Sequence, residues 1–274
     1  MKTIDSLADL QKVEIYIYKE LLRECNNAGV KLYLTGGSLL GAVRHQGFIP
    51  WDDDIDVCMS RPDFEKLLQT TKGRIGENCS IIDPGSDTRY KGVVPVCVYN
   101  NSYVRSSQFK EDENLKISCS IFVYDGVPEG RLKRFLYYKH MFVLRAKHAL
   151  CRADFKHVNT KTAKLFGPVL SPFFRKKSVF KYKNKVLKLQ TKYPYSESRL
   201  VSTNVDYGSQ REVVEKVAFE KGIGIQFENT SSKTFSCYKE FLESYYGDYM
   251  TPPPIEKQKP KHGFYAEIDD SFAL

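Results

Sequence analysis

Residues 33–59 read YLTGGSLLGAVRHQGFIPWDDDIDVCM, and this stretch decides the fold. A short apolar run enters a Gly-Gly-Ser turn, a helical pattern follows, and four aspartates lead into a second apolar run. The order of these patterns predicts two strands that bracket a helix. We expect the strand from Val30 to Leu34 and the strand from Ile55 to Met59 to lie in one sheet.

The turn at Gly36, Gly37 and Ser38 is typical of a site that binds phosphate. Glycines lack a Cβ atom and let the backbone approach a ligand closely. Ser38 stands where an N-cap is expected, so free N–H groups and the positive helix end would face an anion. Such a turn alone is usually structural. Combined with the aspartates that follow, it predicts a site for nucleotide phosphates.

The aspartates that follow predict a metal site. Asp54 and Asp56 are two residues apart on an expected strand, and alternation along a strand sends both side chains to one face. Two carboxylates there favour a cation, and hard oxygen ligands favour Mg²⁺ or Mn²⁺. We expect Asp54 and Asp56 to be catalytic metal ligands and Asp52 an outer-sphere or acceptor-side carboxylate. Asp53 alternates away and is expected to be structural.

Three further side chains lie between the ends of this stretch. Arg44 ends the expected helix, where it either complements the helix dipole or donates hydrogen bonds to phosphate oxygens. We expect His45 to be structural or to position substrate, because no second histidine or cysteine sits at ligand spacing. Trp51, the only tryptophan, is expected to form a rigid wall that orients the aspartates.

Length and cysteine content bound the class of protein. A chain of 274 residues buries one good core with room for a subdomain. Its seven cysteines, an odd number without metal spacing, are typical of reduced thiols in the cytoplasm. The N-terminus has no signal-peptide pattern, and no apolar run approaches the length of a membrane span. We expect a cytoplasmic protein, or one that is peripheral on the inner face of the cell membrane.

The sequence on either side of residues 33–59 predicts an α+β fold, a mixed sheet flanked by helices. Apolar spacing predicts a helix over residues 5–27, stopped by Gly29, and Ser60 caps a second helix. Further strands are expected at residues 79–82, 93–99 and 117–123. We expect three parts, namely a catalytic core in residues 1–130, a basic helical subdomain in 131–200 and a C-terminal part in 201–274 that completes the cleft.

Positive charge is concentrated in residues 131–192. This segment carries 18 lysines and arginines against one acidic residue, Asp154, a net charge of +17 in a chain whose total is +9. Basic and aromatic residues on amphipathic helices suit an anionic membrane surface, where each exposed base adds about 1 kcal/mol. RNA is the competing partner, but no RNA-recognition signature accompanies the charge. We therefore expect an anionic membrane surface and no nucleic acid.

The motif from Gly36 to Asp56 resembles the signature of the LicD family, which includes the fukutin-related enzymes, nearly letter for letter. Arg61, Asp63 and Phe64 resemble its continuation, and residues 246–254, YGDYMTPPP, resemble its closing motif. The resemblance implies that the mixed sheet has a nucleotidyltransferase-like fold and that the protein is a phosphotransferase. Such an enzyme moves a phospho-alcohol, such as phosphocholine, from a CDP-linked donor to a sugar. The acceptor would be a cell-surface glycan such as lipopolysaccharide or teichoic acid, or its lipid-linked precursor.

One position departs from the family pattern. Members usually carry a third carboxylate on a later strand, whereas residues 119–126 read CSIFVYDG, with Ser120 where aspartate is expected. A hydroxyl is a poorer Mg²⁺ ligand than a carboxylate, and Asp125 is expected on the opposite face of the strand. A catalytically weak protein that binds donor or acceptor is therefore one alternative. A nucleotidyltransferase acting on RNA or protein is another.

Overall fold

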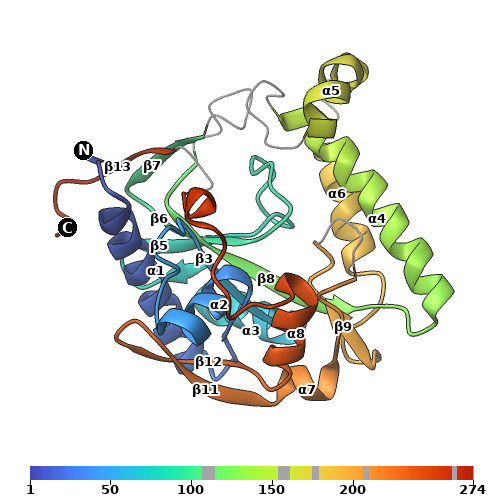
Figure 1. Ribbon diagram of the computed structural model, residues 1–274, viewed down its shortest axis with the longest axis horizontal. Coiled ribbons are helices and arrows are strands. Elements are labelled where there is room, and N and C mark those ends of the chain that lie inside the picture. Colours follow the sequence, from blue (N-terminus) through green and yellow to red (C-terminus); the bar gives the residue numbers. More distant parts are fainter. Residues whose placement is uncertain (107–114, 154–160, 175–178, 206–209, 261–263, 274) are drawn as a thin grey trace.

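The computed structural model describes residues 1–106, 115–153, 161–174, 179–205, 210–260 and 264–273 (Figure 1). The α-helices are α1 (Leu7–Ala28), α2 (Gly36–His45), α3 (Arg61–Thr71), α4 (Arg131–Arg152), α5 (Lys161–Leu170), α6 (Val179–Gln190), α7 (Lys216–Glu220) and α8 (Tyr238–Tyr246). Two 3-10 helices are η1 (Ser171–Phe173) and η3 (Ile255–Lys257). The strands are β1 (Lys2–Ile4), β2 (Tyr33–Leu34), β3 (Ile55–Ser60), β4 (Arg74–Ile75), β5 (Cys79–Ile82), β6 (Val96–Tyr99), β7 (Ser102–Ser106), β8 (Ser118–Gly126), β9 (Leu200–Ser202), β10 (Val214–Glu215), β11 (Gly222–Phe227), β12 (Thr230–Phe235) and β13 (Phe264–Ile268).

The main sheet is organised around β8. One edge of β8 pairs in parallel with β3, and the other edge pairs antiparallel with β6 and then with β9. The remaining order continues from β6 to β5 and β4 and from β9 to β10, while β2 pairs antiparallel with β3. A sheet with both strand directions and helices packed on it confirms the α+β class and the mixed sheet.

Caps fix the first two predicted helices. Ser6 accepts a hydrogen bond from the Asp9 N–H at the start of α1, and Gly29 ends this helix with φ 62°. Ser60 accepts from the Asp63 N–H at the start of α3, as predicted. Side-chain acceptors satisfy N–H groups that have no partner within a helix, which explains why these boundaries were predictable.

Both ends of the chain contribute to one hydrophobic core. It combines Val13 and Ile17 of α1 with Phe219, Phe235 and other residues of the C-terminal part. β13 lies between β1 and β7, so the last described strand completes a sheet with the first. The C-terminal residues are therefore integral to the same core as the N-terminal motif. The division into three parts at 130 and 200 stays a prediction.

The described residues of the basic segment are mostly helical, as predicted. α4 and α6 pack on each other over a second apolar cluster that includes Tyr138, Met141 and Val186. α4 runs along the outer edge of the molecule, and α5 lies beyond one of its ends (Figure 1). Among the described residues, no helix combines the length and the apolar content that crossing a membrane requires. All seven cysteines are free thiols, six of them buried.

Candidate active site

The first turn of α2 forms one wall of the site. The helix begins at Gly36 and its N-cap is Thr35, so the prediction that Ser38 is the cap was wrong. The Ser38 hydroxyl has another partner, because it accepts a hydrogen bond from the Asp56 N–H at 2.8 Å. Ser38 thus braces α2 against β3 from a buried position. The N–H groups of Gly36, Gly37 and Ser38, which open the helix, have no acceptor within it.

Two carboxylates lie directly against this turn. A Cβ atom placed on Gly37 would be 2.6 Å from Asp52 Oδ2, and one placed on Gly36 would be 2.9 Å from Asp56 Oδ2. Real Cβ atoms do not approach an oxygen so closely, so a larger residue at either position would displace a carboxylate. The two glycines therefore allow Asp52 and Asp56 to reach the positive end of α2, where a negative charge is favourable.

The aspartates before β3 form a compact cluster. Asp52, Asp53 and Asp54 each place one carboxylate oxygen within 4.8 Å of the others, and the first two are buried. The expectation that Asp53 points away was wrong. The strand begins only at Ile55, and a turn closed by the Asp52 N–H and the Ile49 carbonyl precedes it, so alternation does not govern these residues. The assignment of Asp54 and Asp56 as the ligand pair stays a prediction.

Ser120 lies beside Asp56. The parallel register of β3 and β8 pairs the two residues directly, so their side chains share one face of the sheet. Ser120, the position at which an aspartate was expected, therefore lies next to Asp56, and its side chain carries a hydroxyl. Asp125 is engaged elsewhere, because it accepts two hydrogen bonds from the Arg61 guanidinium, at 2.9 and 2.7 Å.

Glu14 of α1 is a buried acid near the cluster that sequence reasoning missed. Its side chain is 3% exposed, and its Oε2 has no hydrogen-bond partner among the described residues. Burial raises the pKa of Glu14 well above its ordinary value, and the negative charges of the aspartates in residues 52–56, Asp54 first, raise it further. Gln11, one turn earlier, donates to the Asp52 carbonyl at 2.9 Å and ties α1 to the same loop. A charged residue on the apolar face of a helix was the available signal.

Part of the C-terminal motif lies near the same aspartates. Desolvation raises the pKa of the Tyr246 hydroxyl, at the end of α8, although the residue is 40% exposed, and the charges of Asp56 and the neighbouring aspartates contribute to this shift. Arg44 donates from Nη1 to the Tyr249 carbonyl at 3.1 Å and from Nε to His45 Nε2 at 2.9 Å. The end of this motif is therefore bound to α2 through the Tyr249 carbonyl, and the position of Tyr246 near the aspartates was not predicted from the sequence.

His45 and Trp51 form a small aromatic contact next to these residues. Their ring centroids are 6.4 Å apart in an edge-to-face arrangement. Burial lowers the pKa of His45, and the positive charge of Arg44 lowers it further. A neutral His45 accepts the hydrogen bond from Arg44, and the groups of potential metal ligands found among the described residues do not include it. His45 thus has structural contacts, as expected.

Comparison with protein families assigns the chain. A family model described as LicD/FKTN/FKRP, nucleotidyltransferase domain, matches residues 29–202. The chain belongs to the LicD family. The matched span of this LicD protein contains α2, the four aspartates and Ser120, whereas Glu14 and Tyr246 lie outside it.

Curated relatives agree with this assignment. The chain is 30% identical over 246 residues to a protein of Haemophilus influenzae named lipopolysaccharide cholinephosphotransferase LicD. The matched span covers 87% of this chain and 89% of that relative. Over 56 residues it is 63% identical to the human and mouse proteins named ribitol 5-phosphate transferase FKRP, or 20% of this chain and 11% of theirs. The relation to the first protein extends over most of both chains, and the relation to the second is local.

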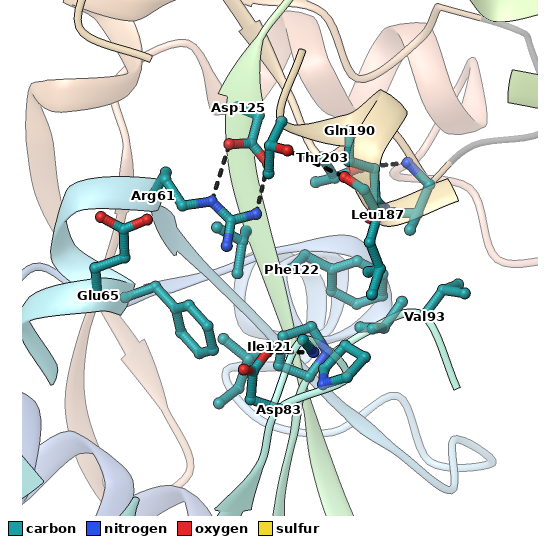
Figure 2. A pocket seen from close by; sticks show the side chains of 18 of the residues that line it. Arg61, Glu65, Asp83, Val93, Ile121, Phe122, Asp125, Leu187, Gln190 and Thr203 are labelled. Atoms are coloured by element: carbon teal, nitrogen blue, oxygen red, sulfur yellow. Dashed lines mark hydrogen bonds and ion pairs between the residues drawn. The ribbon is translucent and has the colours of Figure 1, made fainter. Parts of the chain in front are cut away.

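A separate cavity of about 410 Å³ lies between α3, β8 and α6. Figure 2 shows the Arg61–Asp125 ion pair at one end of it, with Phe122 and Leu187 along its side. None of the predicted site residues lines this cavity. It opens where β8 has left β6 and has not yet reached β9. The candidate active site of the LicD protein is therefore the acidic cluster beside α2, and this cavity is distinct from it.

Proposed function

We propose that this LicD protein is a Mg²⁺- or Mn²⁺-dependent transferase of phospho-alcohols. It moves a group of the phosphocholine type from a CDP-linked donor to a sugar hydroxyl of a cell-surface glycan or its lipid-linked precursor. The observation that carries the proposal is the acidic cluster packed against the glycine-rich first turn of α2. Two relatives named as a cholinephosphotransferase and a ribitol 5-phosphate transferase support the class of transferred group. Within this proposal, the core has the nucleotidyltransferase fold.

The donor set of the site fits a hard divalent cation. Carboxylate oxygens of residues 52–54 gather within 4.8 Å, and the buried Oε2 of Glu14 lacks a hydrogen-bond partner among the described residues. Several carboxylates in one place are stable when a cation offsets their charge. Asp54 and Asp56 would hold the metal, and Asp52 would lie on its outer side. Such an ion, when bound, supplies charge neutralisation for a pyrophosphate.

The residues of the chain would position the reactants. The backbone N–H groups of Gly36, Gly37 and Ser38 open a helix and suit a phosphate of the donor. Arg44 places a cationic guanidinium group in the last turn of α2. In the transfer, the acceptor oxygen forms a bond to the phosphorus next to the alcohol while the pyrophosphate P–O bond breaks. CMP leaves, and Asp52 on the acceptor side takes the hydroxyl proton.

Ser120 favours a second candidate function. A site with one carboxylate fewer binds a metal more weakly, so the protein would bind donor or acceptor with little turnover. Transfer of a nucleotide to RNA or protein is a further alternative that uses the same fold. These alternatives differ from the main proposal in the ligand that they need and in whether product forms.

A thermal-shift panel separates the three functions. Wild-type protein is heated with CDP-choline, CDP-ethanolamine, CDP-ribitol, CTP or ATP, each with and without Mg²⁺, because a ligand that binds the folded state raises the melting temperature. The transferase predicts stabilisation by one CDP-alcohol only when Mg²⁺ is present, and the nucleotidyltransferase predicts stabilisation by a triphosphate. Stabilisation by a CDP-alcohol without release of CMP would support the binding protein. The matched control is Asp56→Asn, which should lose the Mg²⁺-dependent shift.

A further inference from the structure

One side of α4 exposes apolar side chains at helical spacing. Its members recur three, four and seven residues apart, so they form a stripe along the helix. They are Leu132, Phe135, Leu136, Phe142 and Val143, each between 44% and 72% exposed. The opposite side of α4, which includes Tyr138 and Met141, is buried in the cluster shared with α6. The helix is therefore apolar on two sides, and only one of them is covered by the described residues.

The next two helical elements also expose apolar side chains. The exposed residues there are Leu165, Phe166, Val169, Leu170 and Phe173. Of the sixteen large apolar side chains that the structure shows exposed, ten lie between Leu132 and Phe173. Soluble surfaces rarely gather so many apolar side chains in one part of the chain without a partner. We call these ten residues of α4, α5 and η1 the apolar face.

Basic residues are interspersed with the apolar face. Arg131, Lys133 and Lys139 are exposed on α4, and Lys139 Nζ lies 5.3 Å from the centre of the Phe135 ring. The whole segment 131–192 has 18 basic residues and one acidic residue, so at most one of those charges could be neutralised within it. The acid, Asp154, and the bases Lys156 and Arg175–Lys177 of this segment lie outside the described residues. The partner of this surface must therefore supply both negative charge and an apolar interior.

We propose that the apolar face docks on an anionic lipid bilayer, with its Leu, Phe and Val side chains among the acyl chains and its bases on the phosphate headgroups. A bilayer interface offers both environments at the depth of one helix lying in its plane. A second copy of the chain would bring an equally basic surface, and the two would repel each other. RNA would bind the lysines and arginines of this surface. Aliphatic side chains such as Leu132 and Val169, however, gain nothing from contact with phosphates or nucleobases.

This docking goes beyond the transfer reaction and does not depend on it. A protein bound in this way would hold its active site near a lipid-linked acceptor, which matches the acceptor class of the proposed function. The face lies in α4, α5 and η1, whereas the acidic cluster lies in the loop before β3. Membrane binding and catalysis can therefore be tested separately with the same protein.

Vesicle flotation of the full chain tests the proposal. Vesicles of phosphatidylcholine alone are compared with vesicles that contain equal parts of phosphatidylcholine and phosphatidylglycerol, at low and physiological salt. We expect binding to the anionic vesicles only, weakened by salt because the attraction is screened. The double variants Leu132→Ser/Leu136→Ser and Phe166→Ser/Val169→Ser should each lose about tenfold or more in partitioning, because burial of apolar side chains contributes to interfacial binding.

A matched control uses apolar residues that are equally exposed elsewhere. Val217→Ser/Ile255→Ser removes side chains that are 75% and 82% exposed outside the apolar face, and it should bind vesicles as wild type does. Insertion has its own readout, because brominated acyl chains should quench the fluorescence of Leu136→Trp beyond the background from Trp51. Circular dichroism confirms that each variant folds.

Four results would overturn the proposal. Equal binding to neutral and anionic vesicles would show that the basic residues do not contribute to binding. Unchanged binding of both serine variants would show that the apolar side chains do not contribute. Displacement of vesicles by RNA at physiological salt would make RNA the partner. A stable dimer in solution that Leu132→Ser/Leu136→Ser dissociates would make this face an interface between copies.

Discussion

Replacing Ser120 by aspartate tests whether this position is a vacated ligand site. The register of β3 and β8 pairs Ser120 with Asp56, and the β-carbons of two directly paired residues lie about 5 Å apart. The variant Ser120→Asp thus places a new carboxylate next to the existing one, on the same face of the sheet. Its effect should have opposite signs in the absence and in the presence of a metal.

The magnitude follows from the spacing. Two charges about 5 Å apart repel by about 3 kcal/mol at an effective dielectric constant of about 20. Ser120 and Asp56 are both half-buried, so solvent screens part of this repulsion. We expect the metal-free free energy of unfolding to fall by about 1–2 kcal/mol. The extra charge should tighten Mg²⁺ or Mn²⁺ binding about tenfold, which corresponds to 1.4 kcal/mol, and raise transfer.

Urea unfolding with and without Mg²⁺ and calorimetric titration with Mn²⁺ measure the two effects. The isosteric variant Ser120→Asn is the matched control, because it has the shape of aspartate without its charge. It should reproduce neither the loss of metal-free stability nor the gain in affinity. Unchanged metal affinity in Ser120→Asp, or lower transfer activity, would show that residue 120 is not a vacated ligand position.

Three further predictions concern single residues. In Gly37→Ala the new Cβ would lie 2.6 Å from Asp52 Oδ2 and should displace this carboxylate, which lowers the free energy of unfolding by about 1–3 kcal/mol and weakens Mn²⁺ binding. Gly130→Ala is the control, because its new Cβ would meet no atom within 4 Å. Equal losses of stability in the two variants would show that the clash with Asp52 is not the cause. Glu14→Gln should unfold at higher urea than wild type at pH 8 without metal, because the raised pKa of Glu14 makes its charged form unfavourable in the fold. The difference should vanish below pH 4.5, and its persistence there would count against charge as the cause. Burial and, to a smaller extent, the positive charge of Arg152 lower the pKa of His148 from 6.5 to about 4. The contribution of neutral His148 to the free energy of unfolding, which is complete above pH 6.5, should therefore be lost as the pH falls towards 4. Urea unfolding should show wild type losing roughly 2 kcal/mol more than His148→Asn between pH 7 and pH 5, and parallel losses would contradict the shift.

Local signals made much of the fold predictable. The cap of α3 at Ser60 and the end of α1 at Gly29 were predicted correctly, because a capping residue acts on backbone groups close to it in the sequence. The spacing of apolar residues placed β3 and β5 within one residue of their observed ends. β2 is shorter than the strand predicted over residues 30–34, because the paired length of a strand depends on its neighbour, and only Tyr33 and Leu34 of this segment pair with β3.

The arrangement of the site depended on contacts that no local pattern contains. Asp53 joins its neighbours because residues 52–54 lie in an irregular segment between the turn at residues 49–52 and β3, and not on the strand. Ser38 was expected to cap α2, but its hydroxyl is needed by the Asp56 N–H eighteen residues later. Glu14 lies near the aspartates because α1 packs beside their loop, where Gln11 donates to the Asp52 carbonyl, and Tyr246 because the segment after α8 is bound to α2 through the Tyr249 carbonyl. The types of residues in the site were therefore predictable from the sequence, whereas the contacts between them depended on tertiary packing.

The most direct test of the proposed function is Mg²⁺-dependent transfer from a CDP-alcohol to a glycan acceptor. CMP release and the mass of the acceptor are measured together for wild type, Asp54→Asn and Asp56→Asn, at saturating donor with Mg²⁺ or with a chelator. We predict that wild type adds one phospho-alcohol per CMP released, only with Mg²⁺, and that both variants stay folded and inactive. Transfer that persists in the chelator, or equal activity of either variant at saturating Mg²⁺, would contradict the assignment of this acidic cluster as a metal-dependent active site.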